Sequence, residues 1–428
     1  MKAGKDELLA NLPVNSAGNL TWGGADTLAL AKEFGTPLYV VDQNMVESRC
    51  KSFRTALKKR YPDGEVIYAG KALFCRAMCQ IIAEQGLSLD VVSGGELYVA
   101  VKSGFNPQKI YFHGNNKSSH ELEMALEYNV GTIIVDNWHE LEMLNSLAGK
   151  TTKMQRVYLR IAPGIEAHTH VHIQTGQEDS KFGFTREDAP KAALAVVNSS
   201  NLLLAGIHCH IGSQIHNLDS YALATKTMIK IKEEIEQATG IHLSELDLGG
   251  GIGIQYLPDD PLVTPDELVE IIYQNLPDSK LKIRVEPGRY IIGQAGITLY
   301  TIGSSKEIPG IRTYVAVDGG MTDNPRVALY DAKYHAVLAD KPLAQPTKKV
   351  SIAGKCCESG DMLIWDIDLP KIESGDILTI FSTGAYNYSM ASNYNLLPRP
   401  AMVFVKDGEP RLVVRRETYQ DLLTRDVK

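Results

Sequence analysis

Residues 246–253 read Leu-Asp-Leu-Gly-Gly-Gly-Ile-Gly, a short apolar run followed directly by a glycine-rich turn. Short apolar runs that alternate with longer segments of helical period predict repeated βα units. Eight such runs lie between residues 60 and 290, at 66–69, 89–92, 110–112, 132–135, 157–161, 203–207, 246–248 and 283–285. Eight parallel strands with helices between them predict an α/β fold, a (β/α)8 TIM-type barrel.

The character of the sequence changes after residue 290. Strand-like runs follow one another there with turns and few helices between them, at 297–302, 313–317, 349–352, 377–380, 401–405 and 411–414. A chain of 428 residues also exceeds the size at which one hydrophobic core stops growing. We therefore predict a barrel at 36–290 and a second, mainly β domain, sandwich or barrel-like, formed by 1–35 and 291–428. Whether the strand at 37–41 packs with the second domain stays open.

A helix is expected just before the first barrel strand, because Val46, Cys50, Phe53 and Leu57 share one helical face. The composition, 44% hydrophobic and 22% charged, is that of a globular protein in water. The net charge of -7 comes without a basic run, so neither nucleic acid nor membrane is an expected partner. The N-terminus lacks the apolar core of a signal peptide, and the six cysteines show no zinc-site or disulfide spacing. We therefore expect a cytoplasmic protein that contains no metal. Its expected partners are small molecules or copies of itself.

Reactive side chains follow the predicted barrel strands, where barrel active sites collect. These residues are Lys71, Asp90, Ser93, His113, Asp136, His208, His210 and Glu286. The triple glycine with Gly250 and Gly251 lets backbone N–H groups approach an anion, and Arg289 in Glu286-Pro287-Gly288-Arg289 adds a forked donor. Loops after strands 7 and 8 often bind phosphate in such barrels. A simple flexible turn is an equally good interpretation of the glycines alone.

Lysines usually solvate a surface, but a lysine directly after a barrel strand, on the same rim as a phosphate cradle, can form a Schiff base with pyridoxal 5′-phosphate (PLP). Glu286 then suits the pyridine nitrogen and favours carbanion chemistry such as decarboxylation; the alternative is a helix-capping acid. His210, with Ser213 three residues later, is either a core histidine or a flat partner stacked on the cofactor ring.

Over nearly its whole length the sequence resembles the fold-type III PLP-dependent decarboxylases, and among them the diaminopimelate decarboxylase family. The motifs that carry the resemblance lie at 36–40, 93–97, 113–117, 175–183, 208–214, 249–251, 286–289, 318–321, 357–361, 384–386 and 399–400. The resemblance implies removal of CO2 from the D-centre of meso-2,6-diaminopimelate to give L-lysine, the last step of lysine biosynthesis. It also implies a homodimer with shared active sites, and a loop at 168–184 that closes over the substrate.

The resemblance also implies a role for each matching residue. Lys71 binds PLP, His210 stacks on it and Glu286 pairs with its ring nitrogen. Ser213, Gly251, Gly288 and Arg289 are the implied phosphate contacts, and Gly250 and Pro287 are further implied cofactor contacts. Cys357 is the implied proton donor, and the implied substrate-binding residues are Arg289, Arg326, Tyr330, Glu358 and Tyr386, the last also a cofactor contact.

Two departures from the family pattern stand out. Leu73 follows Lys71-Ala72 where many relatives have asparagine, and two adjacent cysteines, Cys356 and Cys357, precede Glu358; spacing selects Cys357. Three alternatives stay open: a decarboxylase of another basic amino acid or of carboxynorspermidine, an alanine-racemase-like enzyme, and a non-catalytic regulator. Glu286 argues against the racemase, which has arginine at that place.

Overall fold

The computed structural model describes residues 12–165, 180–276 and 280–427. These residues divide into two compact units. The barrel unit comprises Arg49–Gly253 and Val263–Tyr290, and the β unit comprises the residues up to Ser48, Ile254–Leu262 and the residues from Ile291 onward. Within the described ranges, no helix is both long enough and apolar enough to span a bilayer.

The barrel unit contains the predicted closed parallel barrel. Its strands are β4 (Glu65–Ala69), β5 (Ser88–Val91), β6 (Ile110–Phe112), β7 (Thr132–Val135), β8 (Gln155–Arg160), β9 (Leu202–His208), β10 (Glu245–Asp247) and β11 (Lys282–Val285). They pair in chain order from β4 to β9, and β10 and β11 close the ring. Each predicted run is a strand, so the predicted fold class is confirmed.

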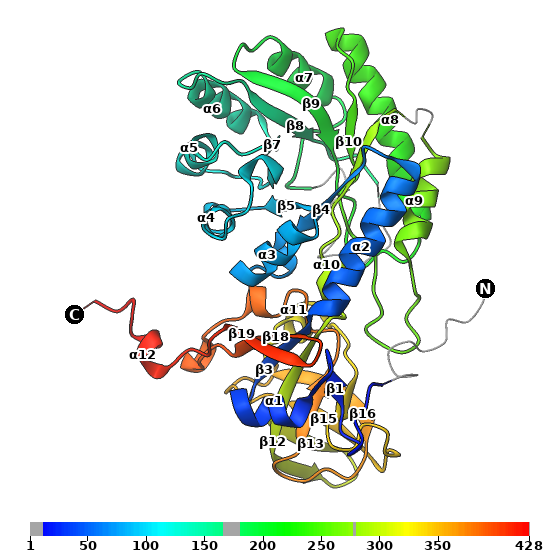
Figure 1. Cartoon of the computed structure of the whole chain (residues 1–428), viewed down its shortest axis with the longest axis vertical. Coiled ribbons are helices and arrows are strands. Elements are labelled where there is room, and N and C mark those ends of the chain that lie inside the picture. The colour runs from blue at the N-terminus through cyan, green and yellow to red at the C-terminus, as the bar shows by residue number, and fades with distance from the viewer. Residues whose placement is uncertain (1–11, 166–179, 277–279, 428) are drawn as a thin grey trace. The chain divides into compact units, whose positions relative to one another are not determined.

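Helices precede, connect and follow the strands on the outside of the barrel (Figure 1). They are α2 (Gln43–Arg60), α3 (Arg76–Glu84), α4 (Gly94–Lys102), α5 (Ser119–Glu127), α6 (Trp138–Ala148), α7 (Ala189–Val197), α8 (Asp219–Thr239), α9 (Pro265–Gln274) and α10 (Arg289–Ile292). The apolar face predicted for the first of these is buried, with Val46, Cys50, Phe53 and Leu57 fully enclosed. Capping boxes begin α5 at Ser118 and α9 at Thr264, and each one satisfies backbone N–H groups at the start of its helix.

The amino ends of the barrel strands are closed by a buried ionic network. Arg284 lies 3.4 Å from a carboxylate oxygen of Glu65 and 3.1 Å from one of Glu245. Above it, Ile67, Tyr111, Ile134 and Tyr158 fill the interior. The carboxyl ends of the strands are therefore the end at which chemistry can take place.

The β unit is built on a nine-stranded sheet. Its main path runs β16 (Met362–Leu369), β15 (Lys348–Ala353), β13 (Arg312–Val317), β12 (Gly296–Ile308), β3 (Leu38–Asp42), β18 (Ala401–Lys406), β19 (Glu409–Val414), while β17 (Ile377–Ile380) pairs with β12 and with β14 (Ala336–Leu338). The pair β1 (Thr21–Trp22) and β2 (Ala25–Asp26), and the helices α1 (Thr27–Phe34), α11 (Arg326–Tyr330) and α12 (Tyr419–Leu422), complete the unit.

The predicted boundaries differ from the observed units in two segments. Residues 36–48 belong to the β unit, because β3 pairs with β12 on one side and with β18 on the other. Residues 254–262, expected within the barrel, also join the β unit. Strands β1, β2, β14 and β16 were not predicted. In β16 the left-handed Asp366 (φ 54°) and the accompanying shift of register interrupt the alternation that reveals a strand.

Candidate active site

Lys71 lies in a tight turn, Gly70–Ala72, immediately after β4. A Cβ at Gly70 would come within 2.6 Å of the Asp90 carbonyl oxygen and of the Phe74 ring, so this turn requires glycine. Gly288, after β11, packs against the same segment, because its Cβ would lie 3.0 Å from that of Ala69. The turn that carries Lys71 and the turn before Arg289 are therefore neighbours at the carboxyl end of the barrel.

His210 lies close enough to Lys71 for the positive charge of the lysine to act on its imidazole. Burial lowers the pKa of His210 well below its usual value, and the positive charges of Lys71 and Arg160 lower it further. The half-buried ring is therefore neutral at physiological pH. A neutral, flat imidazole is the form suited to stacking on an aromatic cofactor.

The glycine loop after β10 is packed too tightly for side chains. A Cβ at Gly250 would lie 1.9 Å from the Glu286 carbonyl oxygen, and one at Gly251 (φ 119°) would lie 2.1 Å from that of Gly212. The Ile215 amide donates to the Gly251 carbonyl, 2.9 Å away, which ties this loop to the loop after β9. The glycines thus form part of a built cradle rather than a flexible turn.

Two polar side chains adjoin this cradle. The Arg289 guanidinium donates to the Ser213 hydroxyl over 2.9 Å, and Arg289 is 7% exposed. A hydroxyl, a guanidinium and glycine backbone are the donors that proteins use for phosphate. The structure therefore brings Ser213, Gly250, Gly251 and Arg289 together, as the sequence predicts.

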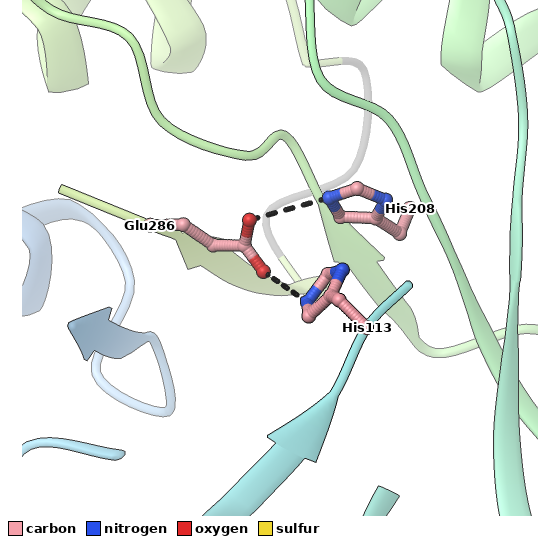
Figure 2. Close-up of side chains that lie close together, drawn as sticks. All are labelled: His113, His208 and Glu286. Carbon is pink, nitrogen blue, oxygen red and sulfur yellow. Dashed lines mark hydrogen bonds and ion pairs between the residues drawn. The ribbon is translucent and has the colours of Figure 1, made fainter. Parts of the chain in front are cut away.

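Glu286 follows β11 and is held between two histidines, as Figure 2 shows. His208 Nε2 is hydrogen-bonded to its Oε2 over 3.3 Å, and His113 Nε2 lies 2.9 Å from its Oε1. Burial favours the protonated acid, but the two imidazoles outweigh it and hold the pKa of Glu286 well below its usual value. Glu286 is therefore an ionised carboxylate, the form that pairs with a pyridinium nitrogen.

The neighbouring buried acids behave differently. Burial, only partly offset by His113, raises the pKa of Asp90 to about 6. Burial and then the charge of Glu286 raise the pKa of Asp247 well above its usual value. Of these three acids, Glu286 is therefore the one whose ionised form its surroundings favour most.

The donor atoms of His113, His208 and Glu286 lie within 4.8 Å of one another and could by chemistry bind a metal ion. In the observed arrangement each Nε2 lies close to a carboxylate oxygen of Glu286, so the two imidazoles face the carboxylate. This set is the only such cluster among the residues that the structure describes.

Sequence reasoning missed Arg160, the last residue of β8. Its guanidinium lies 3.8 Å from Asp136 and over the Phe182 ring, and its charge acts on His208 and His210. Arg160 could have been identified from the sequence if the final residue of each strand had been considered together with the residue that follows the strand. The predicted closing loop at 168–184 lies mostly outside the described residues; from 180 onward, the Gly183 amide donates to Asp136 over 3.1 Å.

The β unit holds the remaining predicted residues. Arg326 begins α11 and is 8% exposed. Its guanidinium donates to the Tyr334 hydroxyl over 2.7 Å and lies 4.8 Å from the centre of the Tyr256 ring. Tyr330, at the end of α11, and Tyr386 (φ 62°) are half-buried. Arg326 is therefore a cation in an aromatic setting, fixed before any ligand binds.

The adjacent cysteines stand in different environments. Burial and Asp361 raise the pKa of the Cys356 thiol to about 12, whereas Cys357 is exposed and its amide donates to Asn395 Oδ1 over 2.8 Å. Asp361 accepts from the Cys356 amide over 2.7 Å and so fixes the turn that presents Cys357 and the exposed Glu358. Neither Asp361 nor Asn395 was singled out from the sequence.

The residues of the barrel unit fit PLP. Lys71 offers an amine for the aldehyde, the cradle with Ser213 and Arg289 offers donors for the phosphate, and Glu286 offers a carboxylate for the ring nitrogen. The glycine loop also has no room for side chains, because Cβ atoms at Gly250 and Gly251 would collide with backbone oxygen atoms of neighbouring loops.

Comparisons with known proteins agree with this chemistry. The pyridoxal binding domain of the pyridoxal-dependent decarboxylases matches residues 43–293. A diaminopimelate decarboxylase of Bacillus subtilis is 51% identical over 96% of both chains, and one of Staphylococcus aureus is 44% identical over 97% of this chain and 99% of that one.

Solved structures show the same relationship. The diaminopimelate decarboxylase of M. jannaschii in complex with L-lysine superimposes with a TM-score of 0.92 at 34% identity, covering 98% of each chain. That of Helicobacter pylori with L-lysine has a TM-score of 0.87 at 32% identity, covering 93% of this chain and 98% of the other. Both the barrel and the β unit are thus accounted for, and the chain belongs to the diaminopimelate decarboxylase family of PLP-dependent decarboxylases.

Proposed function

We propose that this chain decarboxylates meso-2,6-diaminopimelate at its D-centre, with PLP, to give L-lysine and CO2, the last step of lysine biosynthesis. The observation that carries the proposal is the meeting of the Lys71 turn, the glycine cradle and an ionised Glu286 at one end of the barrel. Relatives with the same family activity match the chain over nearly its full length.

Bound PLP supplies an aldehyde that condenses with amines and a ring that accepts the electron pair left when a carboxylate departs. Lys71 would hold the cofactor through its amine, His210 would pack against its ring, and Glu286 would pair with its ring nitrogen. Ser213, Gly251 and the Gly288-Arg289 segment would hold its phosphate, with Gly250 and Pro287 as further cofactor contacts.

The β unit supplies substrate recognition and a proton. Arg326, with Arg289 and Tyr330, binds the distal carboxylate, Glu358 binds the distal ammonium, and Tyr386 contacts cofactor and substrate. A fixed, buried guanidinium supports this assignment, because it loses little entropy on binding a carboxylate. Cys357 delivers the proton from Sγ to Cα after CO2 leaves, since its exposed thiol can approach a ligand whereas Cys356 is tied against Asp361.

The active enzyme is a cytoplasmic homodimer in which Cys357 and Glu358 act at the partner's barrel. The exposure of both side chains on a firmly held turn supports this arrangement, because a turn that reaches a second subunit is exposed in the free chain.

The test is CO2 release from the PLP-loaded protein offered the meso, LL and DD isomers of diaminopimelate, ornithine and arginine in parallel. We expect release from the meso isomer, with L-lysine as product. Arg326→Lys should raise the KM for it by on the order of tenfold or more, because lysine loses the planar fork. Preferential release from ornithine or arginine would contradict the substrate assignment and leave the cofactor assignment intact.

A further inference from the structure

The Glu286 carboxylate is held at both of its oxygens by imidazoles from two different strands. His113 follows β6 and lies 2.9 Å from Oε1, and His208 ends β9 and lies 3.3 Å from Oε2. The two rings meet edge to face with centroids 4.8 Å apart. The carboxylate therefore cannot rotate without losing one of its two polar contacts (Figure 2).

Water cannot replace these contacts, because His113 is 4% exposed, His208 1% and Glu286 6%. A buried carboxylate that lacks donors takes up a proton. The other charged groups around Glu286 do not remove this tendency. Asp90 and Asp247 repel its charge, while the attractive Arg160 makes its own ion pair with Asp136.

We propose that His113 and His208 are positioning residues that fix the orientation and the negative charge of Glu286, and thereby keep the ring nitrogen of the cofactor protonated. The proposal rests on the proposed function, under which Glu286 faces that nitrogen. Each imidazole acts through an Nε2–H donor that faces one carboxylate oxygen. Burial lowers the pKa of His208, in keeping with this tautomer.

The ring nitrogen itself gives a direct measurement. The protein is loaded with PLP that is labelled with 15N at the ring, and the chemical shift of that nitrogen is followed with pH in the substrate-free holoenzyme. We expect the wild type to retain a protonated nitrogen from about pH 6 to about pH 9, since its carboxylate partner is buried and charged.

Paired substitutions distinguish the loss of the N–H donor from the loss of the imidazole's volume. His113→Leu and His208→Leu remove the N–H donor. In the double variant the proton between Glu286 and the ring nitrogen should stay on Glu286, so the 15N resonance should shift to that of the neutral nitrogen. Each single leucine variant should also lower kcat by on the order of tenfold, as expected for one hydrogen bond to a buried charge. His113→Gln and His208→Gln place an amide N–H near the position of Nε2. These variants should therefore largely retain the protonated-nitrogen chemical shift and the wild-type kcat. His120→Leu, an exposed histidine of α5, should change neither.

The outcomes distinguish this inference from the proposed function. Glu286→Gln should produce the neutral nitrogen; a protonated nitrogen in that variant would refute the role of Glu286 itself. If Glu286→Gln changes the shift while the folded leucine variants keep the wild-type shift, only the histidine roles are refuted. A wild-type nitrogen that deprotonates near pH 7, or a stoichiometric metal ion in the purified holoenzyme, would overturn the inference without any variant.

Discussion

Each unit of the molecule buries a carboxylate, and the pKa values of the two carboxylates are shifted in opposite directions. In the barrel unit, imidazoles contact Glu286 and hold its pKa well below the usual range. In the β unit, Asp323 is 2% exposed; it accepts from the Tyr300 hydroxyl over 2.5 Å and from the Gly320 amide over 3.1 Å. Burial raises the pKa of Asp323 to about 7, because these donors do not compensate for lost hydration.

The difference shows that burial alone does not set the charge of a carboxylate; its partners do. The two acids consequently contribute to stability in opposite pH ranges. The contribution of Glu286 is present above its unfolded pKa and is lost as the pH falls through its folded value. That of Asp323 is fully present below its unfolded pKa and is lost as the pH rises through about 7.

A second contrast lies in exposure. The acids and bases around Glu286 are buried and hold one another, whereas Cys357 and Glu358 of the β unit stand in solvent on a turn held by Asp361 and Asn395. This division suits a barrel that binds the cofactor and a β unit that delivers a proton.

The largest effect is expected when the barrel loses Lys71. Lys71→Ala should abolish the visible absorbance of the lysine-bound cofactor and reduce turnover by at least about 10³-fold, because no other amine follows β4. Absorbance spectra and CO2 release measure the two effects. Lys226→Ala, on the exposed face of α8, serves as the control. An unchanged spectrum in Lys71→Ala would refute the role of this lysine.

A smaller effect is expected from the β unit. Cys357→Ala should slow turnover by about 10²-fold, the typical contribution of a general acid, and leave the cofactor spectrum unchanged. The matched control is Cys356→Ala, which should retain activity because that thiol is tied to Asp361. Loss of the cofactor in Cys357→Ala, or equal losses of activity in the two variants, would contradict the assignment.

Mixing the Lys71→Ala and Cys357→Ala proteins tests whether the units act across subunits. If the site is shared, mixed dimers contain one intact site, and activity should return to roughly one quarter of the wild-type value by random pairing. Activity that stays at the level of the separate variants would place both residues in one subunit's site.

The smallest effect concerns stability and sharpens the comparison of the buried acids. Asp323→Asn removes the titrating carboxyl group. The Tm of the wild type minus the Tm of this variant should therefore decrease as the pH rises from about 4 to about 7. The pKa difference corresponds to about 2–4 kcal/mol after allowance for relaxation. Thermal unfolding followed by circular dichroism at several pH values measures it. A difference in Tm that does not vary with pH would show that Asp323 is ionised throughout.

Much of the fold could be predicted because its signals are local. Each barrel strand is a short apolar run next to a helical segment, and the residues after the strands converge because parallel strands end on the same rim. Lys71, the glycines and Glu286 were found in this way. The unit to which strand β3 belongs stayed open because its partners, β12 and β18, lie far away in the sequence.

The sequence by itself thus determined the barrel, the order of its strands and the residue types at its carboxyl end. Only the tertiary structure decided that His113 and His208 meet at one carboxylate, that Arg160 stands beside them and that Asp361 anchors the cysteine turn. The physical reason is that periodicity and turn chemistry act over a few residues, whereas charge states depend on burial and on partners from distant strands.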